Sequence, residues 1–147
     1  YRQGEGSHII KYSHLINQGI LPPFDSQDDT DCYFWEAKSS KEILTTITRL
    51  VEEDLPASGY DSVQDIQILS PMNKGELGCL NLNQKIQGCL NPGKPSDNPY
   101  KLGTLEFRKK DKVVQLSNNY DLGVFNGEIG IVDYTNVDGA KVVVNTL

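Results

Sequence analysis

Arg2 and Gln3 are the first side chains whose types could take part in phosphate chemistry. A guanidinium group is planar and always charged, and it can bind two phosphate oxygens at once. In phosphoryl transfer, such an arginine stabilises the charge of the transition state. An Arg-Gln pair at the start of a chain can equally be an ordinary pair of surface residues, so other motifs must decide between the two interpretations.

Residues 70–75, Ser-Pro-Met-Asn-Lys-Gly, directly follow an apolar run that predicts a strand. Open α/β sheets bind their ligands at the carboxyl ends of the strands. Ser70, Asn73 and Lys74 could hydrogen-bond phosphates there, contacts that would position a nucleic-acid strand without reading its sequence. The alternative is an ordinary connection between a strand and a helix, in which the proline and the glycine only end the strand and form the turn.

Residues 118–127, Asn-Asn-Tyr-Asp-Leu-Gly-Val-Phe-Asn-Gly, combine amides, two aromatic rings and a tight-turn sequence. Aromatic rings can stack on unpaired bases, while amides and backbone N–H groups hold phosphates. Alternatively, the rings fill a hydrophobic core and the Asn-Gly pair only forms a hairpin turn. The basic run 108–112 is either a phosphate-binding surface or a solvated strand edge. On the DNA-binding interpretation, the side chains involved are Asn118, Asn119, Tyr120, Phe125 and Asn126.

No group in the sequence could catalyse a reaction unaided. The one Gly-Lys pair, Gly93-Lys94, lacks the upstream glycine and the Ser/Thr of a Walker loop. Cys32, Cys79 and Cys89 are odd in number and have no Cys-x-x-Cys spacing, which predicts reduced thiols and no zinc site. The acidic loop 25–31 lacks the spacing of an EF-hand, so we expect no bound metal.

The composition, 37% hydrophobic and 23% charged, is typical of a globular protein. No apolar run approaches the roughly 20 residues that span a membrane, and the polar N-terminus lacks the apolar part of a signal peptide. We therefore expect a cytoplasmic protein with no membrane partner. The net charge is −6, but residues 74–112 hold eight basic and four acidic residues, so this stretch carries +4 and the remainder −10. This asymmetry permits DNA binding without proving it.

The elements that must position these groups alternate in the first 92 residues. Capping residues and helical spacing predict helices at 6–19, 41–54 (ended by Pro56) and 80–90. β-prone runs predict strands at 32–36 and 66–69. The order helix, strand, helix, strand, helix predicts an α/β fold built on a parallel sheet.

The composition changes at Asn91. Residues 91–99 hold three of the seven prolines, which is typical of a linker or long loop. Four or five short strands separated by Asn- and Gly-containing turns then predict a small antiparallel barrel. Its expected strands are 105–108, 112–116, 129–134 and 141–144. We therefore expect two domains, residues 1–92 and 93–147.

Three groups of residues occur in a characteristic order. They are Tyr1–Ser7 with Ile16–Pro22; Leu69–Gly75 with Gly78, Leu82-Asn83, Gln87 and Leu90–Pro92; and Asp111–Gln115 with Asn118–Gly130. Together they resemble the RecD-like superfamily-one DNA helicases, which are related to the exodeoxyribonuclease V alpha chain. The resemblance covers nearly the whole chain, and its third part is the most specific.

The resemblance implies an ATP-dependent DNA helicase that translocates on single-stranded DNA, 5′ to 3′, in recombination or repair. Such helicases clamp ATP between two RecA-like (P-loop NTPase type) motor domains. Residues 1–92 would be part of the second motor, and residues 93–147 an inserted Src-homology-three-like β-barrel that lacks its last strand. Arg2 would reach the ATP γ-phosphate with support from Gln3, and residues 70–75 would lie near the DNA track.

The same resemblance implies that the complete protein needs ATP and magnesium and has single-stranded DNA and other recombination subunits as partners. Because the sequence starts at Tyr1 and has no Walker loop, we expect a fragment that is inactive alone. Two alternatives remain open: a non-enzymatic binding module, and a segment of a conjugative relaxase-type helicase, which shares the barrel motif.

Overall fold

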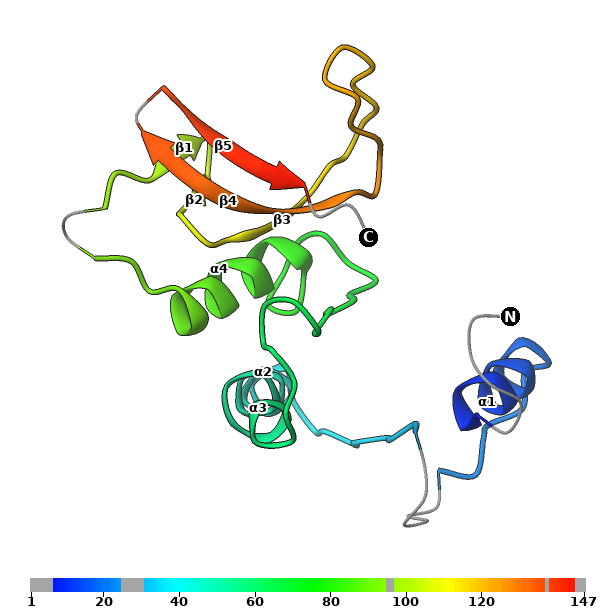
Figure 1. Cartoon of the computed structure of the whole chain (residues 1–147). Coiled ribbons are helices and arrows are strands. Elements are labelled where there is room, and N and C mark those ends of the chain that lie inside the picture. The colour runs from blue at the N-terminus through cyan, green and yellow to red at the C-terminus, as the bar shows by residue number, and fades with distance from the viewer. Residues whose placement is uncertain (1–6, 25–30, 95–96, 137, 145–147) are drawn as a thin grey trace. The chain divides into compact units, whose positions relative to one another are not determined.

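The computed structural model describes residues 7–24, 31–94, 97–136 and 138–144. The chain divides into two compact units, Tyr1–Lys38 and Ser39–Leu147, shown in Figure 1. The domain boundary predicted after residue 92 lies inside the second unit and stays a prediction.

The first unit contains helix α1, His8–Asn17, at the place predicted from the sequence. Ser7 occupies the N-cap position, but its hydroxyl donates to Asp31 Oδ2 at 2.6 Å instead of capping the helix. The other oxygen of Asp31 accepts the His8 N–H at 2.8 Å, so a carboxylate 23 residues away supplies the cap. The Ser7 hydroxyl holds the pKa of Asp31 below its ordinary value.

Aromatic side chains hold the rest of the first unit together. Tyr12 is buried and donates its hydroxyl to the Pro23 carbonyl at 2.8 Å. Its ring meets Phe24 edge-on with centroids 5.3 Å apart, and Phe24 stacks on Phe34 at 4.8 Å. These contacts place the extended segment 31–36 beside α1 without backbone pairing among the residues described.

The second unit begins with a continuous helical stretch made of three elements, α2 (Ser40–Arg49), η1 (Leu50–Asp54) and α3 (Leu55–Ala57). As predicted, Ser39 caps it, because its hydroxyl accepts the Glu42 N–H at 3.2 Å. The prediction that Pro56 ends this helix is wrong, since helical backbone continues to Ala57. The reason lies in η1, which has π-helical hydrogen bonding.

Within η1 and at its end, N–H groups reach five residues back, as in the bond from Leu55 N–H to the Leu50 carbonyl. The next N–H in this pattern would belong to residue 56 and would reach Val51, but proline has none. The Ser62 hydroxyl donates to the Val51 carbonyl instead, at 2.7 Å. A side chain thus satisfies the acceptor that the proline leaves open.

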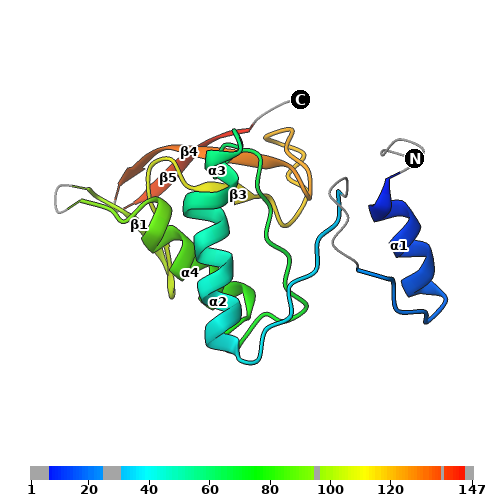
Figure 2. The ribbon, with the colours of Figure 1, turned by 90° about the horizontal axis from the view of Figure 1, so that it is seen from below.

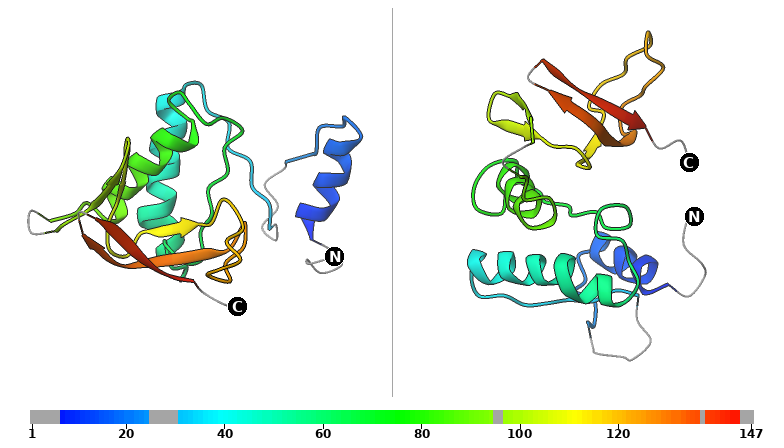
Figure 3. Two further views of the ribbon diagram at one scale, coloured as in Figure 1. Left: turned by 90° about the horizontal axis from the view of Figure 1, so that it is seen from above. Right: turned by 60° about the vertical axis from the view of Figure 1, so that its left-hand side comes forward.

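Helix α4, Cys79–Leu90, confirms the third predicted helix. Its residue Leu82 is buried, as is Val51 in η1. Figure 1 shows α4 between the α2–α3 stretch and the strands, and the right-hand view of Figure 3 shows the same order. Because α4 is covered on two sides, it is the central element of the second unit.

The strands confirm the predicted small antiparallel β-structure. One sheet pairs β1 with β2, and the other has the order β3-β4-β5, with every pair antiparallel. Val132 on β4 is the most deeply buried side chain described, at 1% exposure. Figure 2 shows the strands from below, with α4 beside them. The strand bounds are β1 Tyr100–Leu102, β2 Leu105–Phe107, β3 Lys112–Val114, β4 Ile129–Asn136 and β5 Gly139–Val144.

The two strands predicted at 32–36 and 66–69 are wrong for the chain by itself. Both segments are described, and neither forms a strand. β-prone residues favour extended backbone, but a strand also needs a neighbour to pair with. Among the described residues there is consequently no parallel sheet, and the RecA-like motor fold stays a prediction.

Candidate nucleic-acid interface

Arg2 and Gln3, the residues predicted to meet the nucleotide, lie outside the described residues. Their roles therefore stay predictions. The described histidines, cysteines and carboxylates nowhere gather in a group of three that could hold a metal ion. Within the same residues, no helix is both long and apolar enough to cross a bilayer.

Ser70 organises the loop that joins the extended segment 66–69 to α4. Its hydroxyl donates to the Leu77 carbonyl at 2.7 Å and accepts the Met72 N–H at 3.3 Å. The loop closes tightly, because a Cβ on Gly78 would lie 2.5 Å from the Lys74 carbonyl. These contacts engage the Ser70 hydroxyl inside the loop.

The same loop covers the amino end of α4. The Met72 carbonyl accepts the Cys79 N–H at 2.8 Å, and the Asn73 carbonyl accepts the Leu80 N–H at 3.2 Å. Two donors that a helix start usually leaves open to an anion are therefore occupied. The side chains of Asn73 and Lys74 point to solvent and make no hydrogen bond or ion pair within the described part of the chain. They remain the groups of this loop that a phosphate could reach.

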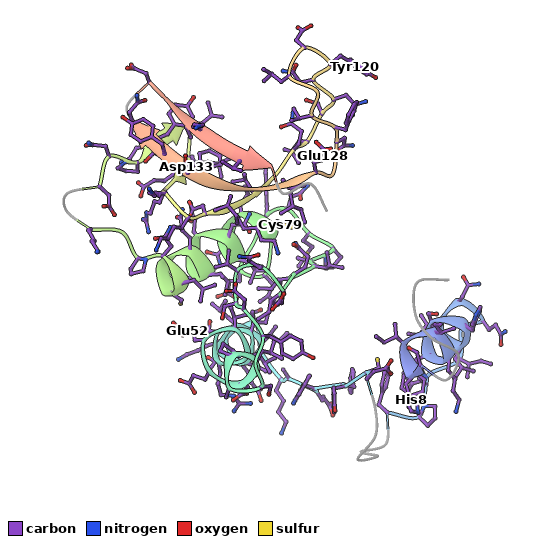
Figure 4. All side chains as sticks on the ribbon, in the orientation of Figure 1. His8, Glu52, Cys79, Tyr120, Glu128 and Asp133 are labelled. Atoms are coloured by element: carbon purple, nitrogen blue, oxygen red, sulfur yellow. The ribbon has the colours of Figure 1, made fainter. Side chains whose placement is uncertain are left out.

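The predicted aromatic motif forms a hairpin between β3 and β4. Asn119 and Val124 pair through two backbone hydrogen bonds, of 2.7 and 3.1 Å. At its base, the Gln115 carbonyl accepts the Gly127 N–H at 2.8 Å, and Gly127 has a φ of +90°, as its turn requires. Figure 4 shows Tyr120 at the outer end of this hairpin and Glu128 near the sheet.

The two aromatic rings of the hairpin face solvent. Tyr120 is 78% exposed and Phe125 45% exposed, so neither fills the barrel core. Their centroids lie 6.1 Å apart with the rings nearly perpendicular. Leu116 and Leu122 are also strongly exposed on this part of the chain. Among the described residues, the rings are therefore not part of a core.

Asn118 and Asn119 use their side-chain amides within the hairpin. Asn118 Nδ2 donates to the Tyr120 hydroxyl at 3.2 Å, and its Oδ1 accepts the Asn126 N–H at 2.8 Å. Asn119 Oδ1 accepts the Leu122 N–H at 3.1 Å. The Asn126 side chain is exposed. The amides predicted to bind DNA thus also shape the loop.

A polar cluster that the sequence analysis did not predict joins the carboxyl end of α4 to the turn before β3. We call these residues, Gln87, Asn91, Arg108 and Asp111, the clasp. The Asp111 carboxylate accepts from Gln87 Nε2 at 2.6 Å, Asn91 Nδ2 at 2.7 Å and the Arg108 N–H at 2.7 Å. Two amide side chains four residues apart on one helix were the available signal.

Arg108 continues the clasp to the sheet. Its guanidinium donates to the Asn91 carbonyl at 2.6 Å and to Glu106 Oε1 at 2.8 Å. The hydrogen bond from Arg108 holds the pKa of Glu106 below its ordinary value, and the smaller effect of burial, which raises that pKa, does not cancel it. Arg108 is therefore committed to internal contacts, whereas Lys109 and Lys110 in the same basic run are exposed.

Lys112, the last residue of the basic run, is also a structural contact. Its ammonium donates to the carbonyls of Gln64 and Ile66, at 3.3 and 3.0 Å. The bond ties β3 to the start of the extended segment 66–69. Of the predicted basic surface, Lys109 and Lys110 are the residues that face solvent.

Comparison with known proteins decides the family. Residues 82–145 match the family described as the SH3 domain of ATP-dependent RecD-like DNA helicases. Over 145 residues, 99% of the chain, the sequence is 38% identical to the ATP-dependent RecD2 DNA helicase of Deinococcus radiodurans. The chain belongs to the RecD-like helicases.

This assignment confirms the resemblance and the small antiparallel Src-homology-three-like domain. The match begins at Leu82 in α4, before the boundary predicted from the sequence, so the RecD-like domain includes the helical half of the clasp. The whole hairpin lies inside it as well. The chain spans 18% of the length of the Deinococcus relative.

Proposed function

We propose that this RecD-like chain is part of an ATP-dependent DNA helicase that translocates on single-stranded DNA in recombination or repair. The match of residues 82–145 to the SH3 domain of such helicases is the observation that carries the proposal. The complete enzyme would be cytoplasmic and would work with other recombination subunits. Its hydrolysis of ATP would require magnesium.

In this proposal, residues 1–92 belong to the second RecA-like motor. The unpaired extended segments support it, because they carry large apolar side chains in solvent. Leu69 is 87% exposed, and Tyr33, Phe34 and Trp35 are all exposed. Monomeric proteins rarely leave such groups uncovered without a partner surface. Strands of a larger sheet on either side would pair their backbones and bury these residues.

Two surfaces of the chain would meet DNA. Lys74 and Asn73 would contact phosphates from the loop that Ser70 organises. The exposed rings of Tyr120 and Phe125 would meet the bases, because aromatic faces stack on unpaired bases of any identity. The first surface positions the strand and the second distinguishes single strands from duplex.

The nucleotide contact is assigned to Arg2, with Gln3 in support. Replacing Arg2 by Ala in the complete helicase should lower the rate of ATP hydrolysis, measured with saturating single-stranded DNA. Arginines that stabilise a transferring phosphoryl group contribute about 10³–10⁵ to the rate. Arg49→Ala is the matched control, because this exposed arginine pairs, among the residues described, with Asp54 on its own helical stretch. Near-normal turnover in the Arg2 variant would refute the assignment.

The non-enzymatic binding module is the second candidate, and the exposed hairpin favours it independently of any motor. ATP hydrolysis by the complete protein, with and without single-stranded DNA, separates the two. Stimulation by DNA supports the motor. No hydrolysis under either condition would leave the binding module.

A further inference from the structure

The Tyr120 ring occupies a defined position although almost nothing covers it. An exposed side chain normally samples several rotamers, and holding it still is entropically unfavourable. Here Phe125 supports one edge of the ring at 6.1 Å, and Asn118 holds its hydroxyl at 3.2 Å. Two contacts at the rim leave the ring 78% exposed.

Asn118 makes a second contact, across the hairpin. Its Oδ1 accepts the Asn126 N–H at 2.8 Å, so one amide bridges the ascending arm, the descending arm and the ring. The Glu128 carboxylate holds the Phe125 N–H at 2.9 Å on the descending arm. Asn118 thus contacts the Tyr120 ring directly, whereas Glu128 holds only the backbone that carries the Phe125 ring.

The exposed surface of the hairpin carries Tyr120, Leu122 and Phe125 beside the polar Asp121 and Asn126. Asn118, Asn119 and Glu128 all accept N–H groups of the loop itself. A tyrosine whose hydroxyl is held by Asn118 offers a partner its ring face. Unpaired nucleobases are the ligand that such a surface fits, since stacking needs no hydrogen-bond partner.

We propose that Asn118 is a positioning residue, which sets the Tyr120 ring as a preformed stacking platform for one unpaired base. This inference rests on the proposed function, because it names the DNA group that the SH3-like domain receives. Preorganisation raises affinity by removing the entropy loss of ordering the ring upon binding. Asn118 itself does not contact the base.

The test measures fluorescence anisotropy of dye-labelled oligothymidine bound to the complete polypeptide, alongside the same strand carrying abasic sites. Tyr120→Ala should weaken binding to oligothymidine about 5- to 150-fold, the range of one stacked base. It should leave binding to the abasic strand almost unchanged. Tyr60→Ala, which removes another exposed tyrosine, serves as control.

A double-mutant cycle isolates Asn118. If Asn118 acts through the tyrosine hydroxyl, Asn118→Ala should weaken oligothymidine binding more in the native protein than in the Tyr120→Phe background. Asn118→Asp keeps acceptors for both the Asn126 N–H and the tyrosine O–H. It should therefore preserve the ratio of oligothymidine to abasic affinity, whatever its added charge does to both.

The outcomes separate this inference from the function on which it rests. Binding to oligothymidine that survives Tyr120→Ala, or an equal loss on the abasic strand, overturns the stacking platform and leaves the DNA-binding role intact. Equal effects of Asn118→Ala in both backgrounds overturn the positioning role alone. If the native protein binds neither strand, the proposed DNA contact itself is wrong.

Discussion

At Gly130 the backbone of β4 runs close against β5. A Cβ placed there would lie 2.6 Å from Val142 Cγ1 and 2.8 Å from the Val143 carbonyl oxygen, closer than real atoms approach. The close approach lets the two strands pair over Val132, the most deeply buried residue described. Gly88 differs, because a Cβ at that helical position would meet nothing within 4 Å.

The two glycines therefore predict opposite effects of alanine. Gly130→Ala should lower the free energy of unfolding by about 1–3 kcal/mol, as overpacking does. Gly88→Ala should raise it by about 0.5–1 kcal/mol, because alanine loses less backbone entropy in a helix. Urea unfolding of both variants measures the difference. A neutral Gly130→Ala would contradict the spacing between β4 and β5.

Among the elements, those whose cause is local were predictable from the sequence. The apolar spacing of α1, α2 and α4 and the Ser39 cap of α2 are local features. The turns between β3, β4 and β5 are likewise marked by Asn-Gly and Asp-Gly pairs. β1 was missed, because it has only three residues after a proline-rich stretch. The strands at 32–36 and 66–69 failed because their pairing depends on neighbours that local sequence does not specify.

Interactions between distant elements were equally hidden. The clasp joins α4 to a turn 20 to 24 residues further along, and no periodicity marks such a pair. The internal partners of Arg108 and Lys112 were also missed, since a basic run has the same sequence whether its side chains face solvent or backbone carbonyls. The exposure of Tyr120, in contrast, agrees with one of the two interpretations of the motif, in which the ring is free to stack on a base.

Removing the Asp111 carboxylate, the acceptor of the clasp, should weaken the link between α4 and the turn before β3. Asp111→Ala leaves three donors without their carboxylate and should cost about 2–3 kcal/mol, as for hydrogen bonds to charged groups. Asp133→Ala is the matched control, because within the described part of the chain that exposed carboxylate has one ion pair, with Lys141 at 3.6 Å. It should cost less than about 1 kcal/mol. If urea unfolding gave the same loss of unfolding free energy for both variants, the clasp would contribute no more to stability than an exposed ion pair.

At the scale of the whole molecule, charge is segregated along the chain. Residues 74–112 carry +4 while the protein carries −6. The structure uses Arg108 and Lys112 internally and leaves Lys74, Lys109 and Lys110 exposed. The effective basic surface is therefore smaller than the sequence indicates, and the net negative charge of the rest of the chain opposes DNA binding.

Salt dependence tests this distribution. Each phosphate contact to single-stranded DNA contributes a slope of about −0.7 in the logarithm of the binding constant against that of salt concentration. Lys74→Ala and Lys109→Ala should each make the measured slope shallower by roughly that amount. Lys41→Ala, an exposed lysine outside the basic stretch, should leave it unchanged. Identical slopes for all three variants would exclude the two lysines as DNA contacts.

Pro56 and Ser62 have a shared consequence for how this sequence can diverge. The proline withholds a donor from the Val51 carbonyl, and the serine hydroxyl supplies one at 2.7 Å. Replacing Ser62 alone leaves the Val51 carbonyl without a donor. Replacing Pro56 alone restores a backbone N–H that could fill the same role, so Ser62 would no longer be needed. The two positions, six residues apart, are therefore coupled: which residues are tolerated at one depends on the residue at the other. A lineage that discards the proline is free to vary the serine, and one that keeps the proline is not.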